Sequence, residues 1–147
     1  MLDAKEIDAR VRGSFARQTI MTTLGAEIAS VRSGAVEIVL PFSDRILQQH
    51  DFIHAGAVAT IADSACGYAA LSVMPRDAAV LTTEFKINLL APAKGERLRA
   101  IGRVVRSGKK LVITLGEVFA EEGGARKQVA LITATMMVIE TGTGLRD

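Results

Sequence analysis

The chain has 147 residues, of which 49% are hydrophobic and 4% aromatic, and its 18 basic residues nearly balance its 16 acidic residues. These numbers suit one soluble domain with an aliphatic core, and they exclude the strongly basic surface of a nucleic-acid-binding protein. A single cysteine excludes an intrachain disulfide, and neither a signal sequence nor an uncharged apolar run of about 18 residues is present, so we expect a cytoplasmic protein that does not enter the membrane.

The first third of the chain predicts one helix and a pair of strands. An amphipathic pattern over residues 4–17, with apolar positions four residues apart, predicts the helix. Residues 18–25 are rich in threonine and are interpreted as a connector with one short turn. Strands are predicted for residues 26–31 and 35–42, because the Ser-Gly pair between them is a hairpin signal.

Residues 48–74 are the stretch around which the chain is organised. They predict a long apolar helix over residues 55–73 that contains a single acid, Asp63. A carboxylate inside an apolar helix is costly to bury unless it is paired or used. The helix residues within about 60° of Asp63 are all small, so another part of the fold or a ligand can approach closely there. These residues are Gly56, Ala59, Thr60, Cys66, Gly67 and Ala70.

Four more strands are predicted after this helix, separated by short glycine-containing breaks that are typical of antiparallel neighbours. They cover residues 79–90, 96–105, 111–121 and 127–139. The tail, residues 141–147, is rich in glycine and threonine and is expected to fray. An antiparallel sheet of about six strands wrapped around the long helix, in one domain of residues 1–147, explains why that helix is hydrophobic nearly all round. The predicted fold class is α+β.

The start of the central helix offers backbone hydrogen-bond donors. No proline occupies the first turn, so the N–H groups of Ala55 and Gly56 are expected to be available at the positive end of the helix dipole. Such donors can polarise a carbonyl or bind an anion. Together with Asp63, about two and a half turns beyond His54, they could serve acyl transfer.

Two motifs in this arrangement resemble a known family. His54-Ala55-Gly56 followed by Ile61-Ala62-Asp63 resembles the HGG…D signature of the PaaI-type acyl-CoA thioesterases, which have the hotdog fold. Residues 82–95, TTEFKINLLAPAKG, resemble the strand and turn that follow this signature in the family. The resemblance covers roughly residues 15–139 in element order. It implies hydrolysis of an acyl-CoA thioester to a free acid and coenzyme A, without a cofactor, by a homodimer or a homotetramer built as a dimer of dimers.

The resemblance also implies roles for particular residues. Asp63 matches the acid that attacks the thioester or activates water. The N–H groups of Ala55 and Gly56 match the oxyanion donors, although Ala55 stands where glycine is usual. Gln48 matches a polar amide that orients the carbonyl or the water, and Thr82 matches a hydroxyl that holds the water near the acid. In the family such a site is shared across a dimer interface.

Several of these residues also have a purely structural interpretation. Asp63 can be a structural acid satisfied by a partner chain, Thr82 can be an ordinary strand residue, and His54 can simply cap the helix although it belongs to the motif. Cys66 has no activating partner near it in sequence and is expected to be a small core residue. The pair of His50 and His54 is weak evidence for a metal, and no metal site is expected.

Substrate contacts are expected on the small side of the central helix and at a basic turn. Thr60 and Gly67 lie on the same side as Asp63. The densest basic cluster could bind the phosphates of coenzyme A, or it could be a solvated hairpin end. This cluster comprises Arg103, Arg106, Lys109 and Lys110. Two other functions stay open from the sequence, a non-catalytic acyl-CoA sensor and a hotdog dehydratase or hydratase.

Overall fold

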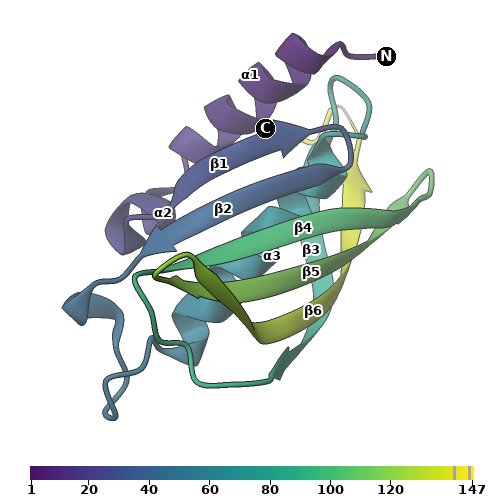
Figure 1. Cartoon of the computed structure of the whole chain (residues 1–147). Helices are drawn as coiled ribbons and strands as arrows, with labels where there is room; N and C mark the ends of the chain where they lie inside the picture. Colours follow the sequence, from purple (N-terminus) through teal and green to yellow (C-terminus); the bar gives the residue numbers. More distant parts are fainter. Residues whose placement is uncertain (141, 146) are drawn as a thin grey trace.

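A computed structural model describes residues 1–140, 142–145 and 147, and it places one curved sheet around a central helix (Figure 1). The sheet has six antiparallel strands in the order β1-β2-β4-β5-β6-β3, and α3 (Ala55–Leu71) packs against it. The expected α+β hotdog architecture is confirmed. The strands are β1 (Glu27–Arg32), β2 (Ala35–Pro41), β3 (Ala79–Leu89), β4 (Arg97–Ser107), β5 (Leu111–Glu122) and β6 (Ala125–Ile139).

Two helices precede the sheet. Helix α1 (Ala4–Ala16) lies along β1 (Figure 1) and begins with a capping box, in which the side chains of Asp3 and Glu6 each accept the other residue's N–H at 2.9 Å. Helix α2 (Thr19–Leu24) occupies the segment interpreted from sequence as a connector. It ends at Gly25, whose φ of 80° is the left-handed conformation that commonly closes a helix.

Glycines on the sheet allow α3 to pack very closely. A Cβ added at Gly102 on β4 would lie 2.3 Å from the carbonyl carbon and oxygen of Ala65, and one added at Gly116 on β5 would lie 2.8 Å from Cys66 Sγ. Cys66 is fully buried, and burial raises the pKa of its thiol to about 12. The part of the small-residue stripe that contains Cys66 therefore packs against the sheet and not against a ligand.

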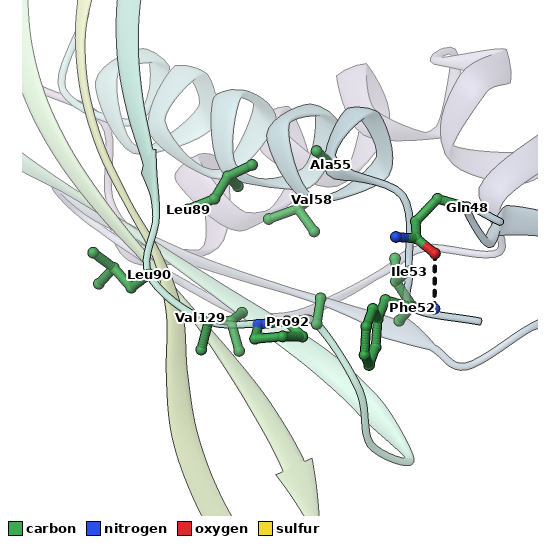
Figure 2. Close-up of a pocket in the computed structure, with 11 residues that line it drawn as sticks. Gln48, Phe52, Ile53, Ala55, Val58, Leu89, Leu90, Pro92 and Val129 are labelled. Carbon is green, nitrogen blue, oxygen red and sulfur yellow. Dashed lines mark hydrogen bonds between the residues drawn. The ribbon is translucent and has the colours of Figure 1, made fainter. Parts of the chain in front are cut away.

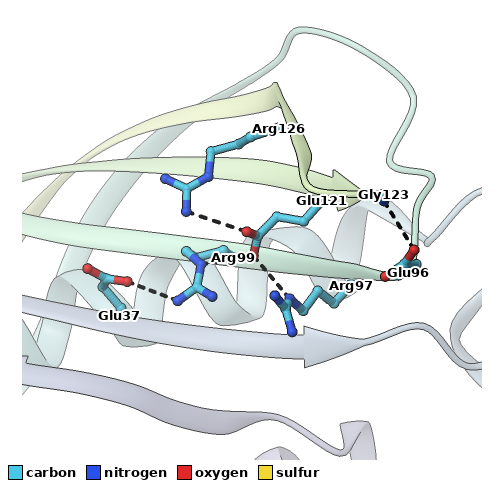
Figure 3. Close-up of polar contacts among 7 residues, drawn as sticks. All are labelled: Glu37, Glu96, Arg97, Arg99, Glu121, Gly123 and Arg126. Carbon is cyan, nitrogen blue, oxygen red and sulfur yellow. Dashed lines mark hydrogen bonds and ion pairs between the residues drawn. The ribbon is translucent and has the colours of Figure 1, made fainter.

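The face of the sheet that is turned away from α3 carries ion pairs between neighbouring strands (Figure 3). Arg99 on β4 lies between Glu37 on β2 and Glu121 on β5, with nitrogen–oxygen distances of 3.0 and 2.9 Å. Glu121 also pairs with Arg97 and Arg126 at 3.2 and 3.4 Å. Partial burial raises the pKa of Glu121, but hydrogen bonds and charges from Arg99 and Arg97 outweigh it, and the pKa lies below its usual value.

Strand β3 forms one free edge of the sheet and pairs with β6 alone in the described part of the chain. Its side chains are unusually exposed for an apolar strand, since Leu81, Phe85 and Leu89 keep 51%, 44% and 54% of their surface accessible. A long, exposed, apolar edge strand is a ready template for pairing with another chain. In the described part of the chain, β3 therefore presents both an unpaired edge and an exposed apolar surface.

The last residues fall partly outside the structure. Residues 141 and 146 of the expected frayed tail lie outside the described residues, whereas the Asp147 carboxylate accepts hydrogen bonds from the Val80 N–H at 2.6 Å and from the Ser14 hydroxyl at 3.2 Å. Among the described helices, none is both long enough and apolar enough to cross a membrane.

Candidate active site

Asp63 lies next to the beginning of β3. The hydroxyl of Thr82 donates a hydrogen bond of 2.8 Å to Asp63 Oδ1 and also lies 3.3 Å from Met136 Sδ. Burial raises the pKa of Asp63 above the usual value of 3.8, and the weaker opposing effect of the Thr82 hydrogen bond lowers it. A half-buried carboxylate with a raised pKa is a better general base at neutral pH than a fully exposed one.

A small cavity of about 160 Å³ surrounds Asp63 between α3, the beginning of β3 and the α1–α2 connection. Gly67 lines it, and a Cβ added at Gly67 would meet no atom within 4 Å. The stripe around Asp63 is therefore divided between a packed part and an open part, and Gly67 belongs to the open part. The sequence did not point to four polar residues that also line this cavity, which are Gln18, Ser64, Tyr68 and Asp147.

His54 caps the start of α3. Its Nδ1 accepts a hydrogen bond of 2.8 Å from the Gly56 N–H, so this N–H is already engaged. No acceptor for the Ala55 N–H is present in the described ranges. The expectation of two available donors at the helix start is thus corrected to one, Ala55. Thr60, the other residue expected near the substrate, donates its hydroxyl to the Gly56 carbonyl at 2.7 Å.

A larger cavity of about 410 Å³ opens at the start of α3 (Figure 2). Ala55, Gln48, Phe52 and the end of β3 line it, and most of the lining is apolar. The Gln48 side-chain oxygen accepts from the N–H groups of His50 and Phe52, the latter at 3.4 Å. Figure 2 shows the amide nitrogen of Gln48 turned toward the other lining residues. Gln48 and the Ala55 N–H therefore share one cavity, and Asp63 and Thr82 share the other.

These two pairs do not meet within one chain. Asp63 lies eight positions beyond Ala55, which corresponds to about 12 Å along a helix that rises about 1.5 Å per residue. The groups that act on one carbonyl must lie about 3–3.5 Å from the reacting atoms. A single chain thus holds the predicted residues in two separate groups, Gln48 with Ala55 and Asp63 with Thr82.

The basic cluster is also divided. Arg103 forms an ion pair with Glu117. Arg106, Lys109 and Lys110 are exposed around the β4–β5 turn and have no acidic partner within the part of the chain that the structure describes. Next to this turn, Val112 on β5 pairs with Met136 on β6, and Met136 pairs in turn with Thr82 on β3. The turn therefore lies at the Asp63 end of the sheet.

The fold and these groups define the class of protein. It is a hotdog-fold protein whose candidate chemistry depends on a carboxylate, a hydroxyl, an amide and a backbone donor. Across the described ranges, no group of three or more His, Cys, Asp or Glu side chains is placed to hold a metal ion.

Comparison with known proteins identifies the family. A family model described as the Thioesterase superfamily matches residues 50–127, and the chain belongs to this superfamily. The crystal structure of a thioesterase family protein from Silicibacter pomeroyi is similar with a TM-score of 0.89 and 47% identity, covering 90% of this chain and 98% of that chain.

Two further structures extend the comparison to PaaI-type proteins. The E. coli PaaI protein from the phenylacetic acid degradation operon has a TM-score of 0.84 at 22% identity, covering 93% of this chain and 96% of that chain, which shows a shared fold. A phenylacetic acid degradation-related protein from Ralstonia eutropha JMP134 has a TM-score of 0.77 at 25% identity, covering 90% of this chain and 99% of that chain. The resemblance to PaaI-type hotdog thioesterases is confirmed, and at this general level the protein is a thioester hydrolase.

Proposed function

We propose that the protein hydrolyses an acyl-coenzyme A thioester at a site shared by two copies of the chain. One copy supplies the Ala55 N–H and Gln48, and the other supplies Asp63 and Thr82. The observation that carries this proposal is the position of these two half-sites at opposite ends of the exposed edge strand β3.

Strand β3 links the half-sites geometrically. The cavity at the helix start is lined by Leu89, at the end of β3, and the Asp63 cavity is lined by residues 80–82, near its beginning. When two antiparallel strands pair about a two-fold axis, the beginning of one strand lies opposite the end of the other. Pairing of β3 with the same strand of a second copy brings Asp63 of one copy toward Ala55 of the other. It also removes the free edge.

The composite site supports hydrolysis in chemical terms. The thioester carbonyl accepts a hydrogen bond from the Ala55 N–H at the positive end of α3, and such a donor contributes on the order of 3 kcal/mol to transition-state stabilisation. Asp63 removes a proton from a water held by Thr82, or attacks the carbonyl carbon itself to form an anhydride that water then cleaves. The Gln48 amide nitrogen orients the carbonyl or the water. The carbon–sulfur bond breaks, the leaving thiolate takes up the proton from Asp63 or one from water, and the products are a free acid and coenzyme A.

The same proposal assigns the remaining contacts. Arg106, Lys109 and Lys110 bind the phosphates of coenzyme A, because they are exposed at the Asp63 end of the sheet, whereas Arg103 is already paired with Glu117. Gly67 contacts the acyl group. The smallest active unit is a homodimer, which can assemble further into a homotetramer, and a free, buried cysteine is compatible with the cytoplasm.

A panel of acyl-CoA esters tests the activity directly. Free-thiol release is measured for each ester, and hydration of an enoyl-CoA is measured beside it. Thiol release without hydration is the expected result. Hydration without thiol release would identify a hydratase instead, and tight binding of the esters without either reaction would identify a sensor.

A further inference from the structure

The Asp63 cavity has a polar wall that belongs to the α1–α2 connection. The Gln18 side chain reaches across to α3, where its Oε1 accepts from the Ser64 hydroxyl at 3.3 Å and its Nε2 donates to the Tyr68 hydroxyl at 2.9 Å. Tyr68 is itself buried, and its hydroxyl lies 3.3 Å from Ser14 Oγ. These contacts hold the Gln18 amide in one orientation at the edge of the cavity that contains Asp63.

Gln18 still has hydrogen-bonding capacity for a ligand. A side-chain amide offers two N–H donors and two acceptor lone pairs. The contacts to Ser64 and Tyr68 use one donor and one acceptor site, and no other hydrogen bond to this amide is present among the described residues. Because Gln18 lines the cavity, the second N–H and the second lone pair can serve a group inside it.

The size and charge of the cavity restrict that group. The volume of about 160 Å³ is much smaller than the ~300–1,000 Å³ that is typical of ligand pockets, so the cavity suits a short group. The carboxylates of Asp63 and Asp147 both line the cavity, so an anionic group is repelled. A short, uncharged group with a polar end fits both restrictions.

We propose that Gln18 is a specificity-determining residue and that the preferred acyl group is short and carries a hydroxyl near its far end. This inference rests on the proposed function, because it places the acyl group in the Asp63 cavity while the carbonyl is attacked. The hydroxyl hydrogen-bonds to the Gln18 amide. An alkyl group of the same length covers the amide without pairing it, which is unfavourable.

The first part of the test compares three esters and three forms of the protein. The esters are γ-hydroxybutyryl-CoA, pentanoyl-CoA, whose acyl group has the same number of non-hydrogen atoms, and the anionic succinyl-CoA. The proteins are the wild type, Gln18→Leu and the matched control Gln128→Leu, which removes a glutamine that donates to Glu117 at 3.2 Å outside both cavities. The measured quantities are kcat and KM from thiol release.

The wild type should use the hydroxyacyl ester about tenfold more efficiently than the pentanoyl ester, and succinyl-CoA least well. Gln18→Leu should remove this preference, mainly through a higher KM for the hydroxyacyl ester, whereas Gln128→Leu should keep it. As a second variant, Gln18→Asn retains the amide but retracts it by one methylene, so it should shift the preference to the hydroxyacyl ester that is one methylene longer.

The possible failures are distinct. Equal wild-type efficiency on the two uncharged esters, or a preference that both Gln18 variants leave unchanged, overturns the assignment of Gln18 while the thioesterase function stands. A purely structural role of Gln18 would lower the melting temperature of its variants without changing the preference, and it would overturn the proposal too. A wild type that releases thiol from no ester overturns the proposed function and this inference together.

Discussion

Thr82 Oγ1 and Asp63 Oδ1 lie 2.8 Å apart, so a hydrogen bond joins the beginning of β3 to the carboxylate in the middle of the apolar helix α3. This bond fixes the orientation of the carboxylate and offsets part of the effect of burial on its pKa. A charge in such surroundings is costly. Because Asp63 also lines a cavity, a substrate or a water molecule can reach this carboxylate, and the cost of burying it is consistent with a catalytic role.

Replacement of this carboxylate tests its role. Asp63→Asn keeps nearly the same shape, and the Thr82 hydroxyl can still donate to the amide oxygen. We expect turnover to fall at least ~100-fold, the lower range for the loss of a general base. Thiol release and a melting curve measure the two properties, and turnover within threefold of the wild type would remove Asp63 from the mechanism.

The same substitution should change how stability depends on pH. The raised pKa means that folded chains bind the Asp63 proton more tightly than unfolded chains. Asp63 therefore favours folding most below its unfolded pKa, and this contribution is lost as the pH rises through the folded pKa. Relative to the wild type, Asp63→Asn should gain stability from acid to neutral pH in denaturant titrations. A constant difference across this range would contradict the raised pKa.

The rate should depend on pH with the opposite sense. The base must be ionised, so kcat/KM should fall as the pH drops through the raised pKa of Asp63, above the usual value of 3.8. Thr82→Val removes the hydrogen bond that lowers this pKa, so the acidic limb of the profile should move to higher pH. Thr82→Ser, which keeps the hydroxyl, should leave the limb in place.

Gly67 offers a test in which stability and activity diverge. A Cβ at this position meets no atom within 4 Å, and alanine has a higher helix propensity, so Gly67→Ala should stabilise the protein by about 0.5–1 kcal/mol. The same methyl group enters the Asp63 cavity and should lower kcat/KM. Gly13→Ala is the matched control, because Gly13 lies in α1 and its added Cβ also meets nothing within 4 Å.

For that control we expect a similar gain in melting temperature and unchanged kinetics. A loss of stability in Gly67→Ala with normal kinetics would show that this side of α3 is packed in the assembly. Gly102→Ala gives the contrast, since its Cβ would lie 2.3 Å from the Ala65 backbone and should strongly destabilise the fold.

The shared site can be tested by complementation. Ala55→Pro removes the proposed oxyanion donor at a position where α-helices tolerate proline, and His54, with φ −58° and ψ 139°, already has the conformation that precedes proline. Mixed Ala55→Pro and Asp63→Asn chains should form heterodimers with one working site, and random pairing of equal amounts predicts roughly a quarter of wild-type activity.

The control for this experiment is Ala55→Ser, which keeps the N–H and should remain active alone. Native mass spectrometry of the mixture establishes that heterodimers have formed. Heterodimers without recovered activity, or an active monomer in sedimentation, would show that each chain contains a complete site.

The sequence was most informative where a local pattern reflects a local cause. The apolar run around Asp63 predicts α3, because a helix enclosed by a sheet is apolar on most sides. Helix α2 was not predicted from its threonine-rich sequence, and its formation depends on the burial of Met21 and on the left-handed Gly25. Both are tertiary or terminal features that six residues with modest helix propensity do not reveal.

At the candidate site, too, the sequence predicts the local motif but not the contacts that form only in the folded chain. The motif predicts Asp63 and the helix start, but not that His54 engages the Gly56 N–H, which depends on a side-chain rotamer. Helical geometry places Cys66 and Gly67 on the same side as Asp63, yet the sheet covers only Cys66. Gln18 is separated from Ser64 by 46 positions, so only the folded chain brings it to the cavity.

The charged network on the outer face of the sheet has a consequence for behaviour in acid (Figure 3). The arginines around Glu121 hold its pKa below the usual value, whereas burial holds that of Asp63 above it. Glu121 adds to the free energy of unfolding at pH values above the pKa that it has in the unfolded chain. This contribution is lost only as the pH falls through the lower pKa that Glu121 has in the folded chain. Acid therefore acts on the two carboxylates in opposite ways: protonation of Asp63 removes the proposed base, whereas the arginines around Glu121 oppose its protonation and keep the ion pairs between the strands. Brief acid exposure should therefore silence the enzyme reversibly, with full recovery on neutralisation and no need for refolding.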